Sequence, residues 1–162
     1  MKIIAVTVTY NRLPILKQHC VAMLSQTRCP EQWIIVDNNS TDGTKEYLLE
    51  LKRMYPDLLT CVFLPENTGG SGGFEQAIRM AYEYGMDYIW GMDDDAIPEK
   101  DALALLEKAA EHYPEDRYCL RSNTYYLDSQ GQFVLEQITQ QDQISGLTFV
   151  GFFIPYKAVS KI

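Results

Sequence analysis

The feature that most constrains the fold of this chain is a regular alternation of two hydrophobic patterns. Four short runs are dominated by β-branched and aromatic residues, as in buried strands, and four longer segments repeat apolar residues at helical spacing. The runs are residues 3–10, 32–37, 60–65 and 87–92, and the helical segments are residues 12–26, 41–55, 73–85 and 98–113. This alternation predicts an α/β fold, in which helices flank a mostly parallel, Rossmann-like sheet through right-handed crossovers.

The pattern changes after residue 114. Three strand-like segments follow, at residues 118–127, 131–137 and 147–155, and only short turns separate them. We therefore expect shorter strands of mixed direction there. Because 162 residues fit one core, we expect a single domain whose two halves meet at residue 114.

The charge and the cysteine content narrow the function. A formal net charge of -8 argues against binding to nucleic-acid backbones, which requires lysine and arginine side chains to displace counterions. The 4 cysteines lack the spacing of a metal site, so we expect reduced thiols in a cytoplasmic protein. The sequence shows neither a signal peptide nor a run of about 18 apolar residues that could span a membrane.

Polar residues gather directly after each of the four expected parallel strands. The clusters are Thr9–Arg12, Asp37–Ser40, Glu66–Thr68 with the glycines that follow, and Asp93–Asp95. Ligands of open α/β sheets bind outside the carboxyl ends of the strands, so these clusters predict one binding site at that edge. The alternative is that Asp, Asn, Ser and Gly only form turns and helix caps, and for any single cluster this alternative stays open.

Two of these clusters are ambiguous when taken alone. Asp37 ends a buried strand and could accept a hydrogen bond from a ribose hydroxyl or a base, or it could cap the following turn. Residues 67–74 hold four glycines in five positions and could bring backbone N–H groups close to a phosphate. Because this segment matches neither the dinucleotide-binding fingerprint nor the P-loop, the glycines alone are a weak indication.

The Asp93–Asp95 triplet is more informative. Three adjacent carboxylates repel one another unless a cation offsets their charge, and alternate residues of an extended strand project to the same side. Asp93 and Asp95 could therefore bind one Mg²⁺ or Mn²⁺ together, with substrate phosphates in other positions. No histidine or cysteine accompanies them, which disfavours zinc. The competing interpretation is a cluster that caps a helix beginning at Pro98.

Four motifs together are similar to a known family. In order along the chain, VTVTYNR, IIVDNNSTDGT, ENTGGSGGF and MDDDAIPEKDAL resemble the nucleotide-binding half of family 2 glycosyltransferases of the GT-A fold. The glycine-rich third motif and the complete aspartate triplet look most like the galactofuranosyl- and rhamnosyltransferase branch. The resemblance covers essentially all of residues 1–114, which it implies are the nucleotide-sugar-binding half of the domain, with the acceptor half starting at residue 115.

The resemblance also implies roles for individual residues. The first motif would line a nucleoside pocket, Asp37 would contact the base or ribose, and residues 93–95 would be a DxD-type motif whose Asp93 and Asp95 hold the metal. The full set of expected nucleotide-sugar-binding residues is Thr9, Tyr10, Asn11, Arg12, Asp37, Asn39, Asn67, Gly69, Gly70, Gly72, Gly73, Asp93 and Asp94.

The implied reaction is inverting, metal-dependent transfer of a sugar from a UDP- or dTDP-sugar to a glycan or lipid-linked acceptor, as in cell-surface polysaccharide synthesis. Mn²⁺ or Mg²⁺ would stabilise the leaving diphosphate, and such acceptors are compatible with peripheral association at the inner membrane face. Inversion also needs a general base, which this family places downstream of the DxD motif. Glu136 and Asp142 lie downstream but in no matching motif. We therefore expect the base beyond Ile162, a truncated domain, and donor binding with little or no transfer.

Two other classes compete with this interpretation. A non-catalytic nucleotide-sugar-binding module on the same fold would share every donor-side feature and lack the base, so it stays open. A phosphotransferase of the haloacid dehalogenase type also uses an Asp-x-Asp motif at a strand end. That class expects its nucleophilic Asp after an early strand, with Thr or Val four residues later. Here the motif follows the fourth strand and the later position is Ile97, which disfavours the phosphotransferase.

Overall fold

The computed structural model describes residues 1–113, 119–121, 125–127, 129–130, 132–135 and 151–159. Its strands are β1 (Ile3–Thr9), β2 (Gln32–Asp37), β3 (Leu59–Phe63), β4 (Tyr88–Asp93), β5 (Leu120–Arg121), β6 (Tyr125–Leu127), β7 (Phe133–Leu135) and β8 (Phe152–Pro155). Its helices are α1 (Leu13–Leu24), α2 (Thr44–Met54), α3 (Gly69–Glu83), α4 (Ala102–Ala110) and α5 (Tyr156–Val159). All four expected strand–helix pairs are present, which confirms the α/β fold.

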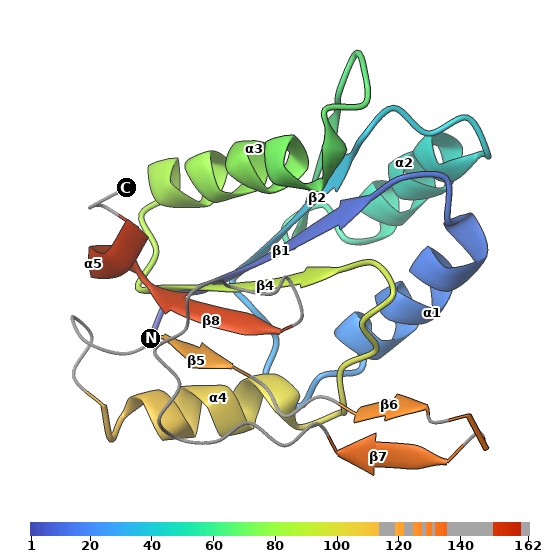
Figure 1. Cartoon of the computed structure of the whole chain (residues 1–162). Helices are drawn as coiled ribbons and strands as arrows, with labels where there is room; N and C mark the ends of the chain where they lie inside the picture. The colour runs from blue at the N-terminus through green and yellow to red at the C-terminus, as the bar shows by residue number, and fades with distance from the viewer. Residues whose placement is uncertain (114–118, 122–124, 128, 131, 136–150, 160–162) are drawn as a thin grey trace.

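The strands form a six-stranded sheet in the order β3-β2-β1-β4-β8-β5 and a separate β6–β7 pair (Figure 1). β1 pairs in parallel with β2 and with β4, and β2 pairs in parallel with β3. β8 runs antiparallel to both of its neighbours, β4 and β5. The expected mostly parallel sheet, with short strands of mixed direction after residue 114, is therefore confirmed.

Helices cover both faces of the sheet, and Figure 1 shows α3 and α4 on opposite sides of it. On one face, α1, α2 and α4 pack on alternate strand residues, and this core includes Ala5, Leu16, Trp33, Leu48 and Leu103. On the other face, α3 packs on the intervening residues, and this core includes Val6, Ile34, Phe74 and Ala77. The two-residue alternation of β1 and β2 thus serves two cores at once. Within the described residues, no helix is long and apolar enough to cross a bilayer.

Helix α3 begins at Gly69 rather than at residue 73, so most of the expected glycine loop is the first turn of a helix. A Cβ on Gly73 would lie 2.5 Å from Cγ1 of Val8 on β1. This glycine is needed because the helix approaches the sheet closely there. A Cβ on Gly70, by contrast, would meet no atom of the described residues within 4 Å. Gly73 therefore allows α3 to pack closely on β1, whereas the backbone at Gly70 faces open space.

Helix α4 begins at Ala102 rather than at Pro98. The segment before it runs across the end of α1, where Nε2 of Gln26 donates to the Glu99 carbonyl oxygen at 2.8 Å. This contact holds residues 96–101 outside the helix. No helix begins at Pro98, so the aspartate triplet does not cap one there, and that competing interpretation is wrong.

β8 joins the sheet beside β4 through a close contact between Phe152 and Gly91. The Phe152 ring lies directly over Gly91, where a Cβ would overlap it, and it meets the Phe74 ring of α3 edge-on with centroids 5.8 Å apart. The expected strands at residues 118–127 and 131–137 are seen as the shorter β5, β6 and β7. Residues 147–150, expected to begin the strand that contains β8, lie outside the described part of the chain.

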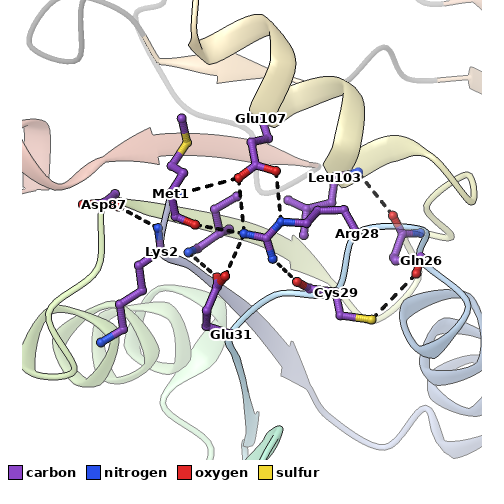
Figure 2. A network of polar contacts seen from close by, with 10 residues as sticks. Met1, Lys2, Gln26, Arg28, Cys29, Glu31, Asp87, Leu103 and Glu107 are labelled. Carbon is purple, nitrogen blue, oxygen red and sulfur yellow. Dashed lines mark hydrogen bonds and ion pairs between the residues drawn. The ribbon is translucent and has the colours of Figure 1, made fainter.

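The amino ends of the strands are tied together by an ion-pair network around Arg28 (Figure 2). Its Nε donates to Oε2 of Glu107 at 2.9 Å, and its Nη2 donates to Oε1 of Glu31 at 2.8 Å. Nη2 also donates to the Met1 carbonyl oxygen at 2.9 Å, and the Met1 ammonium lies 3.9 Å from Glu107. The network joins the start of β1, the residue before β2 and helix α4.

Candidate functional site

A cavity of about 330 Å³ opens at the carboxyl ends of β1 and β4. These strands are neighbours, but the chain leaves β1 in the other direction, toward β2 and β3, before it returns to β4. A reversal of strand order of this kind is where α/β sheets form a ligand crevice. The cavity is lined by Val8, Thr9, Tyr10, Arg12, Asn38, Asn67, Gly69, Gly70, Asp93, Asp94 and Asp95.

One side of the cavity is a tight turn that carries the aspartate triplet. Asp93 is the last residue of β4, and the Ala96 N–H donates to the Asp93 carbonyl oxygen at 3.2 Å. We call residues 93–96 the acidic turn. Asp94 is buried, 3% exposed, and its Oδ2 accepts a hydrogen bond from Oγ1 of Thr9 at 2.6 Å. The middle carboxylate is therefore held against Thr9 at the end of β1.

Arg12, the residue directly before α1, supplies the cation nearest to the acidic turn. Its Nη1 lies 2.8 Å from Oδ2 of Asp95 and 3.4 Å from Oδ1 of Asp94. The Arg12 and Asp95 side chains are each 51% exposed, so this pair contributes at most about 1 kcal/mol to stability. Among the residues that the structure describes, one guanidinium thus faces three carboxylates.

The imbalance changes the acidity of the triplet. Burial, which is the largest cause, and the charges of Asp95 and Asp94 together raise the pKa of Asp93 to about 6, against the opposing charge of Arg12. Burial also raises the pKa of Asp94, against the effects of the Thr9 hydrogen bond and of Arg12. Because neighbouring carboxylates repel one another, the binding of a positive charge is more favourable here than at an isolated carboxylate. The acidic turn therefore favours the approach of a further cation.

Asn38 closes the cavity on the β2 side, although we did not include it among the expected site residues. Its Oδ1 accepts from the Thr68 N–H at 2.8 Å, and its Nδ2 donates to the Gly69 carbonyl oxygen at 2.8 Å. The side chain thus fixes the start of α3 to the end of β2. The sequence carried a signal for it, because Asn38 is the first residue beyond the strand and an amide can both donate and accept.

Two expected residues, Asp37 and Asn11, hold loops together outside the cavity lining, and a third, Asn39, has an unusual backbone conformation. Oδ1 of Asp37 accepts from the Ser40 N–H at 3.0 Å, which is the turn-capping contact that the sequence left open. Asn11 and Asn39 have left-handed backbones, with φ of 51° and 67°. Oδ1 of Asn11 accepts from the Thr41 N–H at 2.7 Å, so the loop after β1 is bound to the loop after β2.

The structure therefore divides the expected site residues into two groups. The residues that it brings together around the cavity are Thr9, Tyr10, Arg12, Asn67, Gly69, Gly70, Asp93, Asp94 and Asp95. The expected residues that do not line the cavity are Asn11, Asp37, Asn39, Gly72 and Gly73. Direct contact of the second group with a nucleotide stays a prediction. The two acidic residues considered as a base, Glu136 and Asp142, lie outside the described residues.

The donor atoms of the acidic turn fit a hard divalent cation that is shared with a phosphate ligand. Within the described residues, no group of three or more His, Cys, Asp or Glu side chains could hold a metal by itself. Mg²⁺ and Mn²⁺, however, often take one or two carboxylates and complete their coordination with water and substrate phosphates. Asp93 and Asp95 both line the cavity, and Asp95 already accepts a cationic donor.

Comparison with known proteins identifies the family. The sequence model described as "Glycosyl transferase family 2" matches residues 4–156. Galactofuranosyltransferase GlfT1 of Mycobacterium tuberculosis is 33% identical over 112 residues, which is 68% of this chain and 36% of that protein. A putative teichuronic acid biosynthesis glycosyltransferase, TuaG of Bacillus subtilis, is 31% identical over 121 residues, which is 75% of this chain and 45% of that protein. The chain thus spans less than half the length of these relatives.

Solved structures support the fold. S. aureus TarS in complex with UDP superposes with a TM-score of 0.77 at 19% identity, covering 99% of this chain and 48% of that one. A mannosyltransferase from Pyrobaculum calidifontis, PcManGT in complex with GDP-Man and Mn²⁺, superposes with a TM-score of 0.53 at 27% identity, covering 64% of this chain and 30% of that one. A family match over residues 4–156, on a sheet whose crevice lies at the reversal of strand order, means that this chain belongs to glycosyltransferase family 2 and has the GT-A fold.

Proposed function

We propose that this chain forms the donor-binding part of an inverting, metal-dependent glycosyltransferase that uses a UDP- or dTDP-sugar. The observation that carries the proposal is the acidic turn, which places three carboxylates against one guanidinium at the mouth of the crevice. A divalent cation would supply positive charge next to the carboxylates, and the nucleoside diphosphate that it accompanies would fill the cavity.

The remaining lining residues suit the other parts of such a donor. Tyr10 is 44% exposed at the cavity and offers an aromatic face on which a base could stack. The Gly70 backbone, with open space where a Cβ would be, allows close approach of a ligand at the start of α3. The N–H groups at a helix N-terminus favour phosphate. The cavity thus offers separate contacts for base and diphosphate.

The role of the cation follows from the chemistry of glycosyl transfer. Breaking the bond between the anomeric carbon and the diphosphate leaves negative charge on the diphosphate, and a bound Mn²⁺ or Mg²⁺ would stabilise that charge as a Lewis acid. In this proposal Asp93 and Asp95 hold the cation. Asp94, fixed by Thr9 and Arg12, orients the turn and can accept a hydrogen bond from ribose or sugar.

The relatives guide the proposal for the whole protein. GlfT1 is named a galactofuranosyltransferase, and TuaG is named for teichuronic acid biosynthesis. We therefore propose an acceptor that is a glycan or lipid-linked glycan of the cell surface. Work on such an acceptor from the cytoplasmic side would bring the protein into peripheral contact with the membrane.

The proposal is tested by the thermal stability of the chain with UDP, dTDP and GDP, each with Mn²⁺, with Mg²⁺ or with EDTA. A ligand at 100 times its Kd stabilises a protein by about 2.7 kcal/mol, which corresponds to a rise in Tm of about 5–10 °C for a domain of this size. We expect UDP or dTDP to produce such a rise only with a divalent cation.

The Asp95→Ala variant should lose the metal-dependent rise. Asp57→Ala is the matched control, because Asp57 is an exposed acid in the turn before β3, at the other end of the sheet. The control should respond as the wild-type chain does. No response of the wild-type chain to any nucleotide, or an equal response of Asp95→Ala, would overturn the proposal.

A further inference from the structure

Helix α1 and its two flanking residues contact the acidic turn and the segment after it at three positions spaced by seven. Arg12 binds Asp95, His19 binds the Ala96 carbonyl oxygen at 2.6 Å, and Gln26 binds the Glu99 carbonyl oxygen at 2.8 Å. Arg12 directly precedes α1, His19 lies within it and Gln26 follows its C-cap, Ser25, so the three contacts are spread along the length of the helix. The helix therefore runs beside the acidic turn as a continuous support.

Arg12 and Gln26 differ from His19 in exposure or in position. The Arg12 side chain is half exposed, and Gln26 binds the segment beyond the acidic turn. Gln26 also accepts from the Leu103 N–H at 3.2 Å, at the start of α4 (Figure 2). His19 differs from both, because it is fully buried and contacts the last residue of the acidic turn itself.

The hydrogen bonds of His19 are directed by the chemistry of its partners. A carbonyl oxygen can only accept, so Nδ1 carries a proton and donates to Ala96. Nε1 of Trp33 can only donate, and it donates to Oγ1 of Thr7 at 3.0 Å. The Thr7 hydroxyl proton is then free for Nε2 of His19, 3.0 Å away. The result is one directed chain from Trp33 through Thr7 and His19 to Ala96.

This chain requires a neutral imidazole, and the surroundings of the ring keep it neutral. Burial lowers the pKa of His19 to about 4, although the Ala96 hydrogen bond and the Asp95 charge oppose that effect. Thr7, His19 and Trp33 are all at most 1% exposed. At neutral pH each polar hydrogen in the chain therefore has one partner, and the tautomer with the proton on Nδ1 is fixed.

The held carbonyl matters because Ala96 closes the acidic turn. Its N–H donates to the Asp93 carbonyl oxygen, while its own carbonyl oxygen is held by His19. Asp94 and Asp95 lie between these two fixed peptide groups. The conformation of the turn, and with it the direction of the Asp95 carboxylate, is thus bound to the core of the sheet through His19.

We propose that His19 is a positioning residue, which fixes the acidic turn so that Asp95 can bind the cation that accompanies the donor diphosphate. The inference rests on the proposed function. Residues that orient metal ligands through hydrogen bonds typically change metal affinity by about 10–100-fold when they are replaced. His19 would act at one further remove, through the backbone of the turn, so we expect a loss near the lower end of that range.

Two replacements separate positioning from packing. Nδ2 of asparagine, like Nδ1 of histidine, is bonded to Cγ, so His19→Asn retains a donor for the Ala96 carbonyl oxygen. His19→Leu introduces an apolar side chain of similar reach and removes the donor. His112 is the chain's only other histidine, it is exposed, and it contacts the Lys108 carbonyl oxygen, so His112→Leu is the matched control.

The measurement is the Kd of the whole chain for UDP and for dTDP with Mn²⁺ and with EDTA, at a temperature where every variant is folded. We expect His19→Leu to weaken the Mn²⁺-dependent binding by about tenfold and to leave binding in EDTA nearly unchanged. His19→Asn should recover most of the loss, and His112→Leu should match the wild-type chain. A lower Tm with an unchanged Kd would show a packing role only and overturn the inference.

A long-range ¹H–¹⁵N NMR spectrum of the histidine rings gives a second readout, independent of binding. We expect His19 to be protonated on Nδ1 and unprotonated on Nε2, and a spectrum with the proton on Nε2 would overturn the inference. Failure of the wild-type chain to bind either nucleotide overturns the proposed function, and the inference falls with it. Normal binding that His19→Leu leaves unchanged overturns the inference alone.

Discussion

The two ends of the parallel sheet treat charge in opposite ways. At the amino ends, Arg28 and the Met1 ammonium face Glu31 and Glu107, so the positive and negative charges are equal in number. At the carboxyl ends, Arg12 faces the three carboxylates of residues 93–95. The first end has its charges balanced within the chain, and the second is left with an excess of negative charge.

The difference separates stability from binding within one sheet. The Arg28 side chain is 23% exposed and donates to two carboxylates and two backbone carbonyl oxygens. Such contacts stabilise the fold because all partners are present without a ligand. In the acidic turn the pKa of Asp93 is raised, so its ionised carboxylate is unfavourable until a cation binds. The two ends can therefore be perturbed independently.

The largest effect on stability should come from Arg28→Met. The substitution leaves Glu31 and Glu107 near each other without their shared cation, and we expect a loss of about 2 kcal/mol in the free energy of unfolding. Denaturant unfolding measures the loss. Arg53→Met, on the exposed side of α2, is the control and should change stability by less than about 0.5 kcal/mol. A fall in donor affinity of the folded Arg28→Met chain would break the proposed separation of the two ends.

A pair of glycine substitutions sharpens the comparison within the carboxyl end. Gly73→Ala places a methyl group 2.5 Å from Val8, so α3 must move away from β1, and we expect a loss of about 1–2 kcal/mol. Gly70→Ala meets open space and should leave stability unchanged or slightly higher. We expect Gly70→Ala nevertheless to weaken UDP or dTDP binding by several-fold in calorimetric titration. Equal affinity of Gly70→Ala and the wild-type chain would mean that no ligand approaches this backbone.

A smaller effect, opposite in sign, is expected for Asp93→Asn without metal or nucleotide. The pKa of Asp93 is raised from 3.8 to about 6, so the folded state binds this proton more tightly than the unfolded state. The carboxylate therefore costs no stability well below pH 3.8, its cost grows as the pH rises from 3.8 to about 6, and the cost is constant above that range. Since Asp93 is partly solvated, we expect Asp93→Asn to gain about 1 kcal/mol at pH 7.5 and almost nothing at pH 4.

The measurement for Asp93→Asn is thermal unfolding in EDTA at both pH values, with Asp57→Asn as the control. The same substitution should abolish Mn²⁺-dependent nucleotide binding. A variant that is less stable than the wild-type chain at pH 7.5 would show that Asp93 stabilises the fold, in conflict with the distinction between the two ends.

The sequence predicted the parts of the molecule that depend on local pattern. The alternation in β1 and β2 reports burial on two faces, and residues such as Asp93 are recognisable because they follow a strand directly. The positions that were misjudged depend on partners distant in sequence. Glycine is a poor helix former, so the sequence predicts a loop at Gly69. The helix there depends on distant partners, because Asn38 holds its first residues at the end of β2 and Gly73 allows it to approach Val8 closely.

The same reason applies to the residues that were missed or misplaced. The expected binding residues include Asn39 but not Asn38, because only the structure shows that α3 begins beside the end of β2. Helix α4 begins at Ala102, later than the sequence predicts, because Gln26 binds the segment before it. Neither contact has a sequence periodicity, so pattern alone could not predict them.

Phe152 packs over Gly91 on β4, but the two residues come from distant parts of the sequence. Pairings between distant segments form slowly, because a long loop must close first. During synthesis β1 to β4 emerge well before β8, and β4 then presents an unpaired strand edge that can recruit another chain. The edge of β4 therefore stays open in a nascent chain until β8 arrives, and the pairing of β8 with residues 88–91 closes it.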